Sequence, residues 1–315
     1  MTLTVLSIAY PPAAVGPHAV GGSEQVLAAL GHALVAAGHC SIVIACEGSE
    51  VAGELMSYPA PPPRHINRPA TSTTRPHQLP GLAMLATLHL PPDWYPDAAL
   101  NPVRPRGRVQ CVSQLQASRS VSPVLLSPIP NGVPVTALGA LHPKRCGYAL
   151  AGLHHALAAA RAARTSLLIG GQVFPYAAYE AYFQDEITPR LDRRRRFLGP
   201  VGFAEQHRLL AAARCLLIPS LVAETSSLVA MEAACGTPVI AFRIGALPEA
   251  VEHGRAGLIV DGAAGRASAL AQVEEIDRKT CRDTARGAHR TAGVRRLSSI
   301  LTQPSRIRAV SDTTG

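Results

Sequence analysis

The chain has 315 residues, of which 47% are hydrophobic and 16% charged, which is enough for two globular domains with apolar cores. An excess of 30 Lys and Arg over 21 Asp and Glu gives a formal net charge of +9, which favours anionic partners. The 7 cysteines are scattered and form no C-x-x-C pair, so neither a disulfide framework nor a zinc site is predicted.

The N-terminal residues 1–8 lack a basic region and are soon followed by Pro11-Pro12, as is typical of a first strand and not of a signal peptide. No apolar run approaches the roughly 18 residues that cross a bilayer. We therefore expect a cytoplasmic protein, with contact at a membrane surface left open. Arg190 and the run over 193–196 concentrate positive charge, either as a solvated loop or as a contact for an anionic acceptor or membrane.

Short β-rich runs alternate with amphipathic helices, which predicts α/β domains with parallel sheets. A strand over 3–8, a helix over 23–37 and a strand over 41–45 form the first βαβ crossover. Residues 59–80, rich in Pro, Arg and Thr, are predicted to be a loop that shortens this domain. A strand-like run over 82–88 follows and ends at His89.

The turn at Asn131-Gly132 predicts a domain boundary near residue 135. The alternation resumes in residues 136–287, which we predict to form a second doubly wound domain. Residues 288–315 are polar and lack periodicity, and we expect a poorly ordered tail. The strands expected in the second domain cover residues 166–169, 197–198, 215–218, 238–242 and 258–260.

Glu224 and Glu232 follow the predicted strand over 215–218 and lie at the two ends of one short predicted helix. Eight residues of helix rise about 12 Å, which exceeds the roughly 5 to 9.5 Å between the carboxyls of a glycosidase acid/base pair. The spacing instead suits the two ends of a long ligand, with free helix N–H groups between them for an anion. An ordinary capped helix with two surface carboxylates is the alternative. The residues at the helix N-terminus are Thr225, Ser226, Ser227 and Leu228.

These residues resemble family 4 of the retaining nucleotide-sugar glycosyltransferases, also described as glycosyl transferases group 1. The E-x7-E pattern carries the resemblance together with Leu198-Gly199-Pro200, Gly236-Thr237-Pro238 and Gly245-Ala246-Leu247-Pro248-Glu249, and it is strongest over 197–261. The resemblance implies the GT-B fold, in which two Rossmann-like, doubly wound parallel-sheet domains face each other across a cleft. Residues 1–135 would be the acceptor-side domain and residues 136–287 the donor-binding domain.

The resemblance also implies an activity, the transfer of a sugar from a nucleoside-diphosphate sugar to an acceptor with retention and without a metal or other cofactor. Glu232 would bind the ribose and Glu224 the transferred sugar, while the amides near Ser226, Ser227 and Leu228 would bind the diphosphate. Such helix-terminus donors suit the charge of the leaving group.

In the first domain, the glycines of Gly21-Gly22 would approach the donor phosphate, and His89 would face the donor sugar. The alternatives are a plain loop at the start of a helix and a structural histidine. The acceptor, whether a saccharide, a lipid or a small molecule, is not identified. Nucleic acid is not expected, because no recognition module accompanies the basic residues.

The chain departs from the family where an Arg and a Lys should clamp the diphosphate. Residues 139–147 place Ala140 where the Arg should be, and the better alignment puts this turn at Ala151-Gly152, directly before a helix beginning at Leu153. Losing two charge-assisted contacts would weaken stabilisation of the leaving group. One alternative is therefore a degenerate nucleotide-sugar-binding homologue. Another is an NAD-dependent oxidoreductase with Glu47 at the ribose, although no G-x-G-x-x-G follows the first strand.

Overall fold

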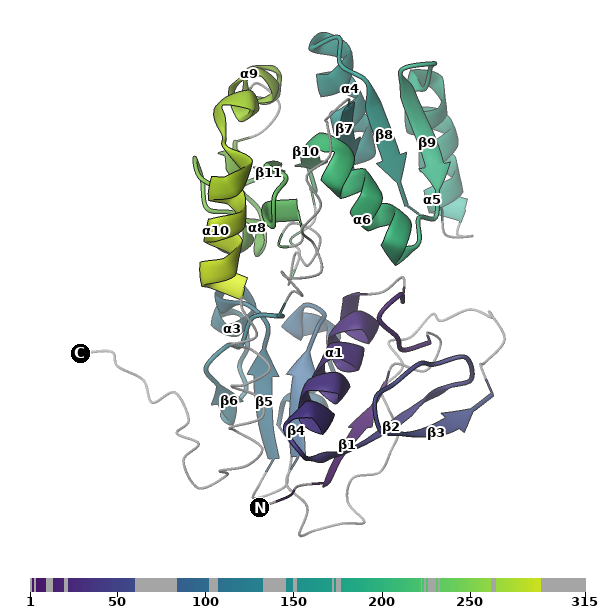
Figure 1. Ribbon diagram of the computed structural model, residues 1–315, viewed down its shortest axis with the longest axis vertical. Coiled ribbons are helices and arrows are strands. Elements are labelled where there is room, and N and C mark those ends of the chain that lie inside the picture. Colours follow the sequence, from purple (N-terminus) through teal and green to yellow (C-terminus); the bar gives the residue numbers. More distant parts are fainter. Residues whose placement is uncertain are drawn as a thin grey trace, which may run out of the picture. The chain divides into compact units, whose positions relative to one another are not determined.

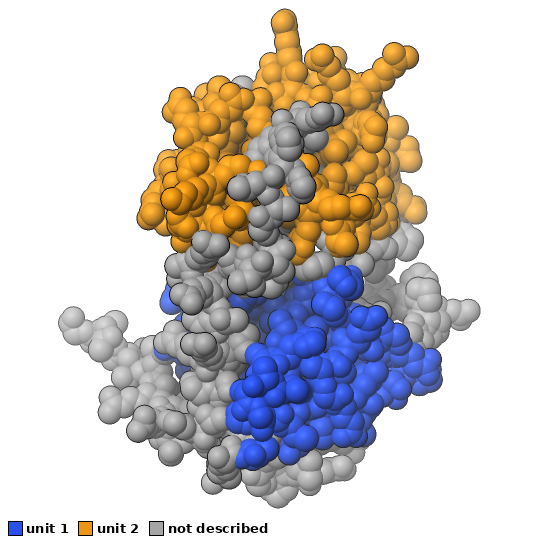
Figure 2. All heavy atoms as spheres, in the orientation of Figure 1, with its two compact units in different colours: residues 1–132, 291–315 blue, residues 133–290 orange. Residues whose placement is uncertain are grey.

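The computed structural model divides into two compact units, drawn in different colours in Figure 2. The described residues up to Gly132 form unit 1, and those from Cys146 to His289 form unit 2. Apart from residues 59, 288 and 289, the predicted loop over 59–80 and the predicted tail over 288–315 lie outside the described residues. The structure describes residues 2, 4–9, 14–19, 22–59, 84–101, 107–132, 146–149, 152–171, 173, 177–221, 223, 225, 231, 233–261 and 265–289.

The first sheet of unit 1 is parallel, with the strand order β1-β2-β3. Strand β1 (Thr4–Ile8) is joined to β2 (Cys40–Cys46) by helix α1 (Gly22–Ala36), which confirms the predicted crossover. Strand β3 (Glu54–Tyr58) pairs with β2 and is not among the predicted strands. Its five residues contain no apolar run, so its pairing with β2 decides its conformation and local propensity does not.

A second sheet of unit 1 is also parallel, in the order β4-β5-β6. Strand β4 ends one residue before His89, as predicted. Short helices lie in the connections between these strands (Figure 1). The elements are β4 (Met84–Leu88), η2 (Pro92–Trp94), α2 (Asp97–Leu100), β5 (Gly107–Cys111), α3 (Gln114–Ser118) and β6 (Leu125–Leu126).

Unit 2 is built on a six-stranded parallel sheet in the order β12-β11-β10-β7-β8-β9. This is the order of a doubly wound Rossmann sheet, in which the first strand lies beside the fourth. The strand β10 (Ala213–Ile218) is buried on both faces: Leu216 and Ile218 join one hydrophobic cluster, and Cys215 and Leu217 join the other. The remaining strands are β7 (Cys146–Ala149), β8 (Leu167–Gly170), β9 (Arg195–Gly199), β11 (Val239–Phe242) and β12 (Gly257–Val260).

Sequence reasoning placed no strand at β7, and this expectation is corrected. The alternation of elements alone would begin the following helix at residue 150, whereas the family alignment begins it at Leu153. The helix α4 begins at Leu153, so the preceding residues are free to pair with β8 and β10. Figure 1 labels most of the helices that surround the sheet. They are α4 (Leu153–Ala162), α5 (Ala177–Tyr182), η3 (Phe183–Ile187), η4 (Thr188–Arg190), α6 (Phe203–Ala212), α8 (Leu247–Ala250), α9 (Arg266–Gln272), η5 (Val273–Glu275) and α10 (Arg278–His289).

The C-terminal helix α10 is attached to the body of unit 2 by arginine side chains. Arg278 Nη2 donates to the Ala211 carbonyl (3.2 Å) and to Thr237 Oγ1 (2.7 Å). Arg282 Nε donates to the Cys235 carbonyl (3.3 Å). These bonds join α10 to the end of α6 and to the turn that precedes β11.

Candidate functional site

The strand order of unit 2 reverses between β10 and β7, and open parallel sheets bind ligands outside the carboxyl ends of the strands at such a point. After β7 the chain reaches Gly152, which caps α4 in the left-handed conformation (φ 59°, ψ 41°). A Cβ on Gly152 would lie 1.7 Å from the carbonyl oxygen of Pro219, which follows β10. The two turns at the switch point are therefore in direct contact, and only glycine fits between them.

The same glycine directs the N-terminus of α4 to this edge of the sheet. The backbone N–H groups of His155 and Ala156 both bond the Gly152 carbonyl (2.9 and 3.2 Å), which fixes the first turn. The first turn of α4 holds no acidic residue, and Gly152 contributes no side-chain cap. The partial positive charge of this helix end is thus not neutralised by a carboxylate of its own first turn.

Two histidines of the first turn of α4 connect the neighbouring elements. His154 Nδ1 lies 2.6 Å from the hydroxyl of Tyr182 at the end of α5. The ring centroids of His154 and His155 are 3.8 Å apart. The centroid of the His155 ring also lies 5.9 Å from the ring centroid of Phe242, the last residue of β11. Burial raises the pKa of the Tyr182 hydroxyl, and a hydrogen bond with the backbone of His154 opposes that rise. The tyrosine therefore stays protonated beside the imidazole.

Sequence reasoning did not select these histidines as site residues. Their signal in the sequence is two adjacent imidazoles directly after the glycine turn, at the position where the family's basic residues are missing. Arg243 and Asp261, which follow β11 and β12, add an exposed ion pair beyond the carboxyl ends of these strands (Nε to Oδ1, 2.9 Å). An exposed pair of this kind contributes little to stability.

Most of the predicted donor-binding helix falls outside the described part of the chain. This applies to Glu224, Glu232, Ser226, Ser227 and Leu228, so their predicted roles stay predictions. Thr225 is described as a half-buried bend residue. On the C-terminal side of the predicted helix, the described residues Met231, Ala233 and Ala234 are helical and buried, and Thr237 Oγ1 donates to the Leu210 carbonyl (2.7 Å).

In unit 1, His89 directly follows β4 in a segment held by side chains. The backbone N–H groups of His89 and Leu90 donate to the hydroxyl of Tyr95 (3.0 and 3.1 Å). Nε2 of the buried Gln116 donates to the carbonyls of Leu88 and Leu90 (2.9 and 2.8 Å). Burial lowers the pKa of the His89 imidazole, so the ring is neutral near pH 7.

The predicted glycine pair of unit 1 is described in part. Gly21 lies outside the described residues, and Gly22 is the first residue of α1. Sequence reasoning did not select Glu24, two residues further on, yet its side chain is buried in the first turn and accepts a hydrogen bond from Ser23 Oγ (3.0 Å). A carboxylate is electrostatically favoured at a helix N-terminus. The first turn of α1 thus already holds a carboxyl group, close to Gly22.

Two negative findings concern only the residues that the structure describes. Within them, no three His, Cys, Asp or Glu side chains gather as they would around a metal ion. Every helix in the same part of the chain is too short or too polar to span a bilayer.

Comparison with known proteins identifies what unit 2 resembles. Residues 132–275, which cover most of unit 2, match a protein-family model. The matching family is glycosyl transferases group 1. This match confirms the resemblance that the sequence motifs indicated.

Two curated relatives, both named D-inositol 3-phosphate glycosyltransferase, align with part of this chain. A D-inositol 3-phosphate glycosyltransferase of Corynebacterium efficiens is 44% identical over 97 residues, which are 30% of this chain and 23% of that protein. The enzyme of the same name from Pseudarthrobacter chlorophenolicus is 50% identical over 66 residues, 21% of this chain and 16% of that protein. The chain thus aligns with less than a quarter of the length of either relative.

Solved structures agree with the chain over nearly its full length. Sucrose-phosphate synthase from Thermosynechococcus elongatus has a TM-score of 0.74 at 20% identity, covering 97% of this chain and 99% of that one. Anabaena Alr3699/HepE, in complex with UDP and glucose, has a TM-score of 0.72 at 16% identity, covering 96% and 100%. At these identities the likeness concerns the fold, and it confirms two Rossmann-like α/β domains of the GT-B class.

Proposed function

We propose that this chain is a glycosyltransferase that moves a sugar from a nucleoside-diphosphate sugar to an acceptor with retention of configuration. One observation carries the proposal: the turns after β7 and β10 meet at Gly152 and Pro219, and α4 begins there with no acidic residue in its first turn. A helix N-terminus at a topological switch point suits the phosphates of a nucleotide. The acceptor is a saccharide, a lipid or a small molecule.

Charge stabilisation of the departing diphosphate falls, in this proposal, to α4 and its histidines. The helix dipole supplies positive charge, and the imidazoles of His154 and His155 offer hydrogen bonds at the place where the family pattern has an Arg and a Lys. Glu232 binds the ribose and Glu224 the transferred sugar, as the family pattern implies. With these groups the proposed reaction needs neither a metal nor another cofactor.

His89 contributes differently from the histidines of α4. Its imidazole is neutral near pH 7 because burial lowers its pKa, so it acts on the donor sugar through a hydrogen bond and not through charge. The fixed backbone around it, held by Tyr95 and Gln116, limits its movement. Such preorganised polar groups lose little entropy when the substrate binds.

The experiment is to incubate the purified full chain with UDP-, GDP- and ADP-sugars and to follow both nucleotide release and the thermal unfolding midpoint. Release of nucleotide together with a raised midpoint would support the proposal. A folded protein that shows neither response to any donor would refute it. His155→Gln should reduce the midpoint shift given by the donor, whereas His32→Gln, a control on an exposed face of α1, should not.

A second candidate function is a nucleotide-sugar-binding homologue with little or no activity. It is favoured by the turn after β7, where the described residues Gly152 and Leu153 lead directly into α4 without an arginine or lysine. A raised midpoint without nucleotide release would support this candidate. The NAD-dependent alternative has no comparable support, since residues 132–275 match glycosyl transferases group 1.

A further inference from the structure

Five exposed arginines gather at the amino edge of the unit 2 sheet, at the opposite ends of the strands from the candidate site. Two follow the course of α4, in its last turn and just beyond it, where the chain turns toward β8. Three belong to the turn before β9 and to the start of that strand. We call them the arginine edge: Arg161, Arg164, Arg193, Arg194 and Arg196.

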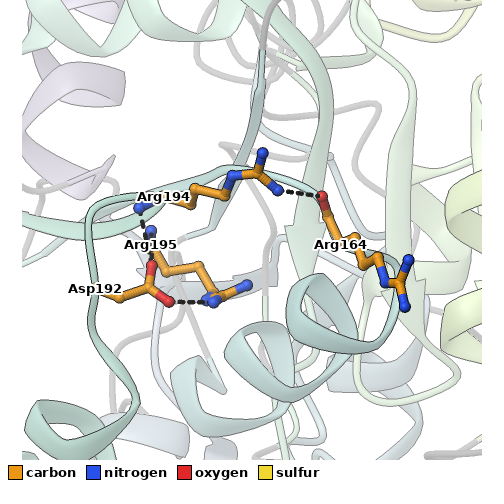
Figure 3. Close-up of polar contacts among 4 residues, drawn as sticks. All are labelled: Arg164, Asp192, Arg194 and Arg195. Carbon is orange, nitrogen blue, oxygen red and sulfur yellow. Dashed lines mark hydrogen bonds and ion pairs between the residues drawn. The ribbon is translucent and has the colours of Figure 1, made fainter.

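Hydrogen bonds hold the turn that carries these arginines. Asp192 Oδ1 accepts the backbone N–H groups of Arg194 and Arg195 (both 2.8 Å), and Asp192 also pairs with the Arg195 guanidinium. Figure 3 shows Arg194 extended toward the main chain of Arg164, whose carbonyl accepts from Arg194 Nη1 at 3.5 Å. The backbone N–H of Leu167 donates to the Arg194 carbonyl (2.9 Å). These hydrogen bonds therefore fix the backbone of the turn that carries the arginines.

Arg164 has a backbone conformation that glycine adopts at a lower cost in stability. Its φ is 52°, the left-handed conformation, in the turn that ends α4. The bonds from Arg164 N to the Arg161 carbonyl (3.1 Å) and from Thr165 N to the Ala160 carbonyl (2.9 Å) complete a Schellman motif. A side chain in this conformation costs stability that glycine would not. An arginine here thus costs the fold stability while adding to the charge of the edge.

Within the described part of the chain, no carboxylate pairs with the charge of the arginine edge. Two other arginines of the same region are paired, Arg190 with Glu186 (2.9 Å) and Arg195 with Asp192. A cation near the C-terminus of α4 is favoured by the helix dipole. That explanation covers Arg161 and Arg164 but not the three arginines before and within β9.

We propose that the arginine edge binds the phosphate groups of an anionic lipid surface. Guanidinium groups bind phosphate through two parallel hydrogen bonds, which lysine cannot do. Five of them, spread over a helix end, a turn and a strand, exceed what one phosphate can contact, so a surface bearing many phosphates fits better. Clusters of four to eight basic residues are typical of such contacts.

Nucleic acid fits the arginine edge less well. Binding to unpaired strands draws on aromatic side chains that stack with bases. The nearby rings of Phe183 and Phe197 pack against each other instead (centroids 4.7 Å apart) and against a hydrophobic core cluster of unit 2. The arginine edge therefore offers charge and phosphate geometry without a platform for bases.

The test is co-sedimentation of the full chain with vesicles of phosphatidylcholine alone or mixed with phosphatidylglycerol, at low and high salt. The chain should bind only the anionic vesicles, and binding should fall as salt rises. Each basic residue near such a surface is worth about fivefold in partitioning. Arg193→Gln and Arg196→Gln should therefore each weaken binding about fivefold. Arg255→Gln, which removes the same charge from an exposed arginine paired with Glu252, should leave it unchanged.

Arg164 gives a variant that separates charge from folding. Arg164→Gly should raise the thermal midpoint and weaken vesicle binding, whereas Arg164→Lys should keep the midpoint close to that of the wild type and weaken binding less than Arg164→Gly does. No binding to anionic vesicles by folded protein, or equal losses for Arg193→Gln and Arg255→Gln, would overturn the proposal. Tighter binding to a duplex oligonucleotide than to the vesicles would show that the arginine edge is a nucleic-acid surface instead. Release of the chain from anionic vesicles by inorganic phosphate as effectively as by added competing vesicles would show that it is a site for free phosphate. None of these outcomes depends on glycosyl transfer.

Discussion

Replacing Gly152 with alanine tests whether the contact at the switch point builds the candidate site. The new Cβ would lie 1.7 Å from the Pro219 carbonyl oxygen, so one of the two turns must move by more than 1 Å, on the order of the missing van der Waals separation. The left-handed backbone costs about 1 to 2 kcal/mol for alanine, and relieving an overlap in a packed region costs about 1 to 3 kcal/mol. We expect a total loss of about 2 to 5 kcal/mol.

The matched control is Gly254→Ala in the same unit. Gly254 also has a left-handed φ (80°), but a Cβ there would meet nothing within 4 Å. Its loss should be limited to the backbone cost of about 1 to 2 kcal/mol. For a unit of this size Gly152→Ala should lower the thermal midpoint by about 5 to 15 °C, and it should also weaken binding of the nucleotide that the donor screen identifies.

The assay follows urea unfolding by circular dichroism and by tryptophan fluorescence together. The only tryptophan, Trp94, lies in unit 1, so its transition should stay unchanged while the dichroism of unit 2 is lost earlier. Equal midpoints for Gly152→Ala and Gly254→Ala would refute the reasoning, because they would show that the Pro219 turn yields without cost. A shift of the transition followed by Trp94 would also contradict the prediction, because it would show that Gly152→Ala destabilises unit 1.

Two further predictions concern titration and thiol chemistry. Because burial lowers the pKa of His89 in the folded state, stability should be full above the unfolded value of about 6.5 and should fall as the pH drops below it. His89→Gln should flatten that slope in urea unfolding followed by Trp94, and an unchanged slope would contradict the assignment. Among the six cysteines whose exposure the structure describes, a maleimide should label the exposed Cys40 first, whereas Cys111 should stay unmodified because burial raises its pKa to about 11. If Cys40→Ser were labelled at the rate of the wild type, another cysteine would react first and the prediction for Cys40 would be wrong.

Local signals were sufficient for several elements of the fold. The crossover from β1 through α1 to β2 follows from hydrophobic periodicity and glycine positions. Residues 215–218 of β10 and the whole of β11 are apolar, as strands buried on both faces must be. These features depend on neighbours in the sequence, so the sequence predicts them.

The central strand β7 could not be predicted in the same way. Its four residues include Gly147 and form no apolar run, and their strand conformation comes from pairing with β8 and β10 on either side. The contact of His154 with Tyr182 joins residues 28 positions apart, so it depends on how α4 and α5 pack. The sequence likewise shows residues 193–196 only as a run of positive charge. The hydrogen bond from the backbone N–H of Arg194 to Asp192, which fixes the backbone of this turn, is visible only in the structure.

The attachment of α10 affects where unit 2 can be cut. The family match ends at residue 275, before the helix over Arg278–His289 begins. A shortened protein that stopped there would lose Arg278 and leave the Ala211 carbonyl without this donor, and it would remove Ala285 from the hydrophobic cluster beside β10 and β11. The stable piece of this chain is therefore longer than its recognisable family segment, and expression of unit 2 alone should extend at least through residue 289.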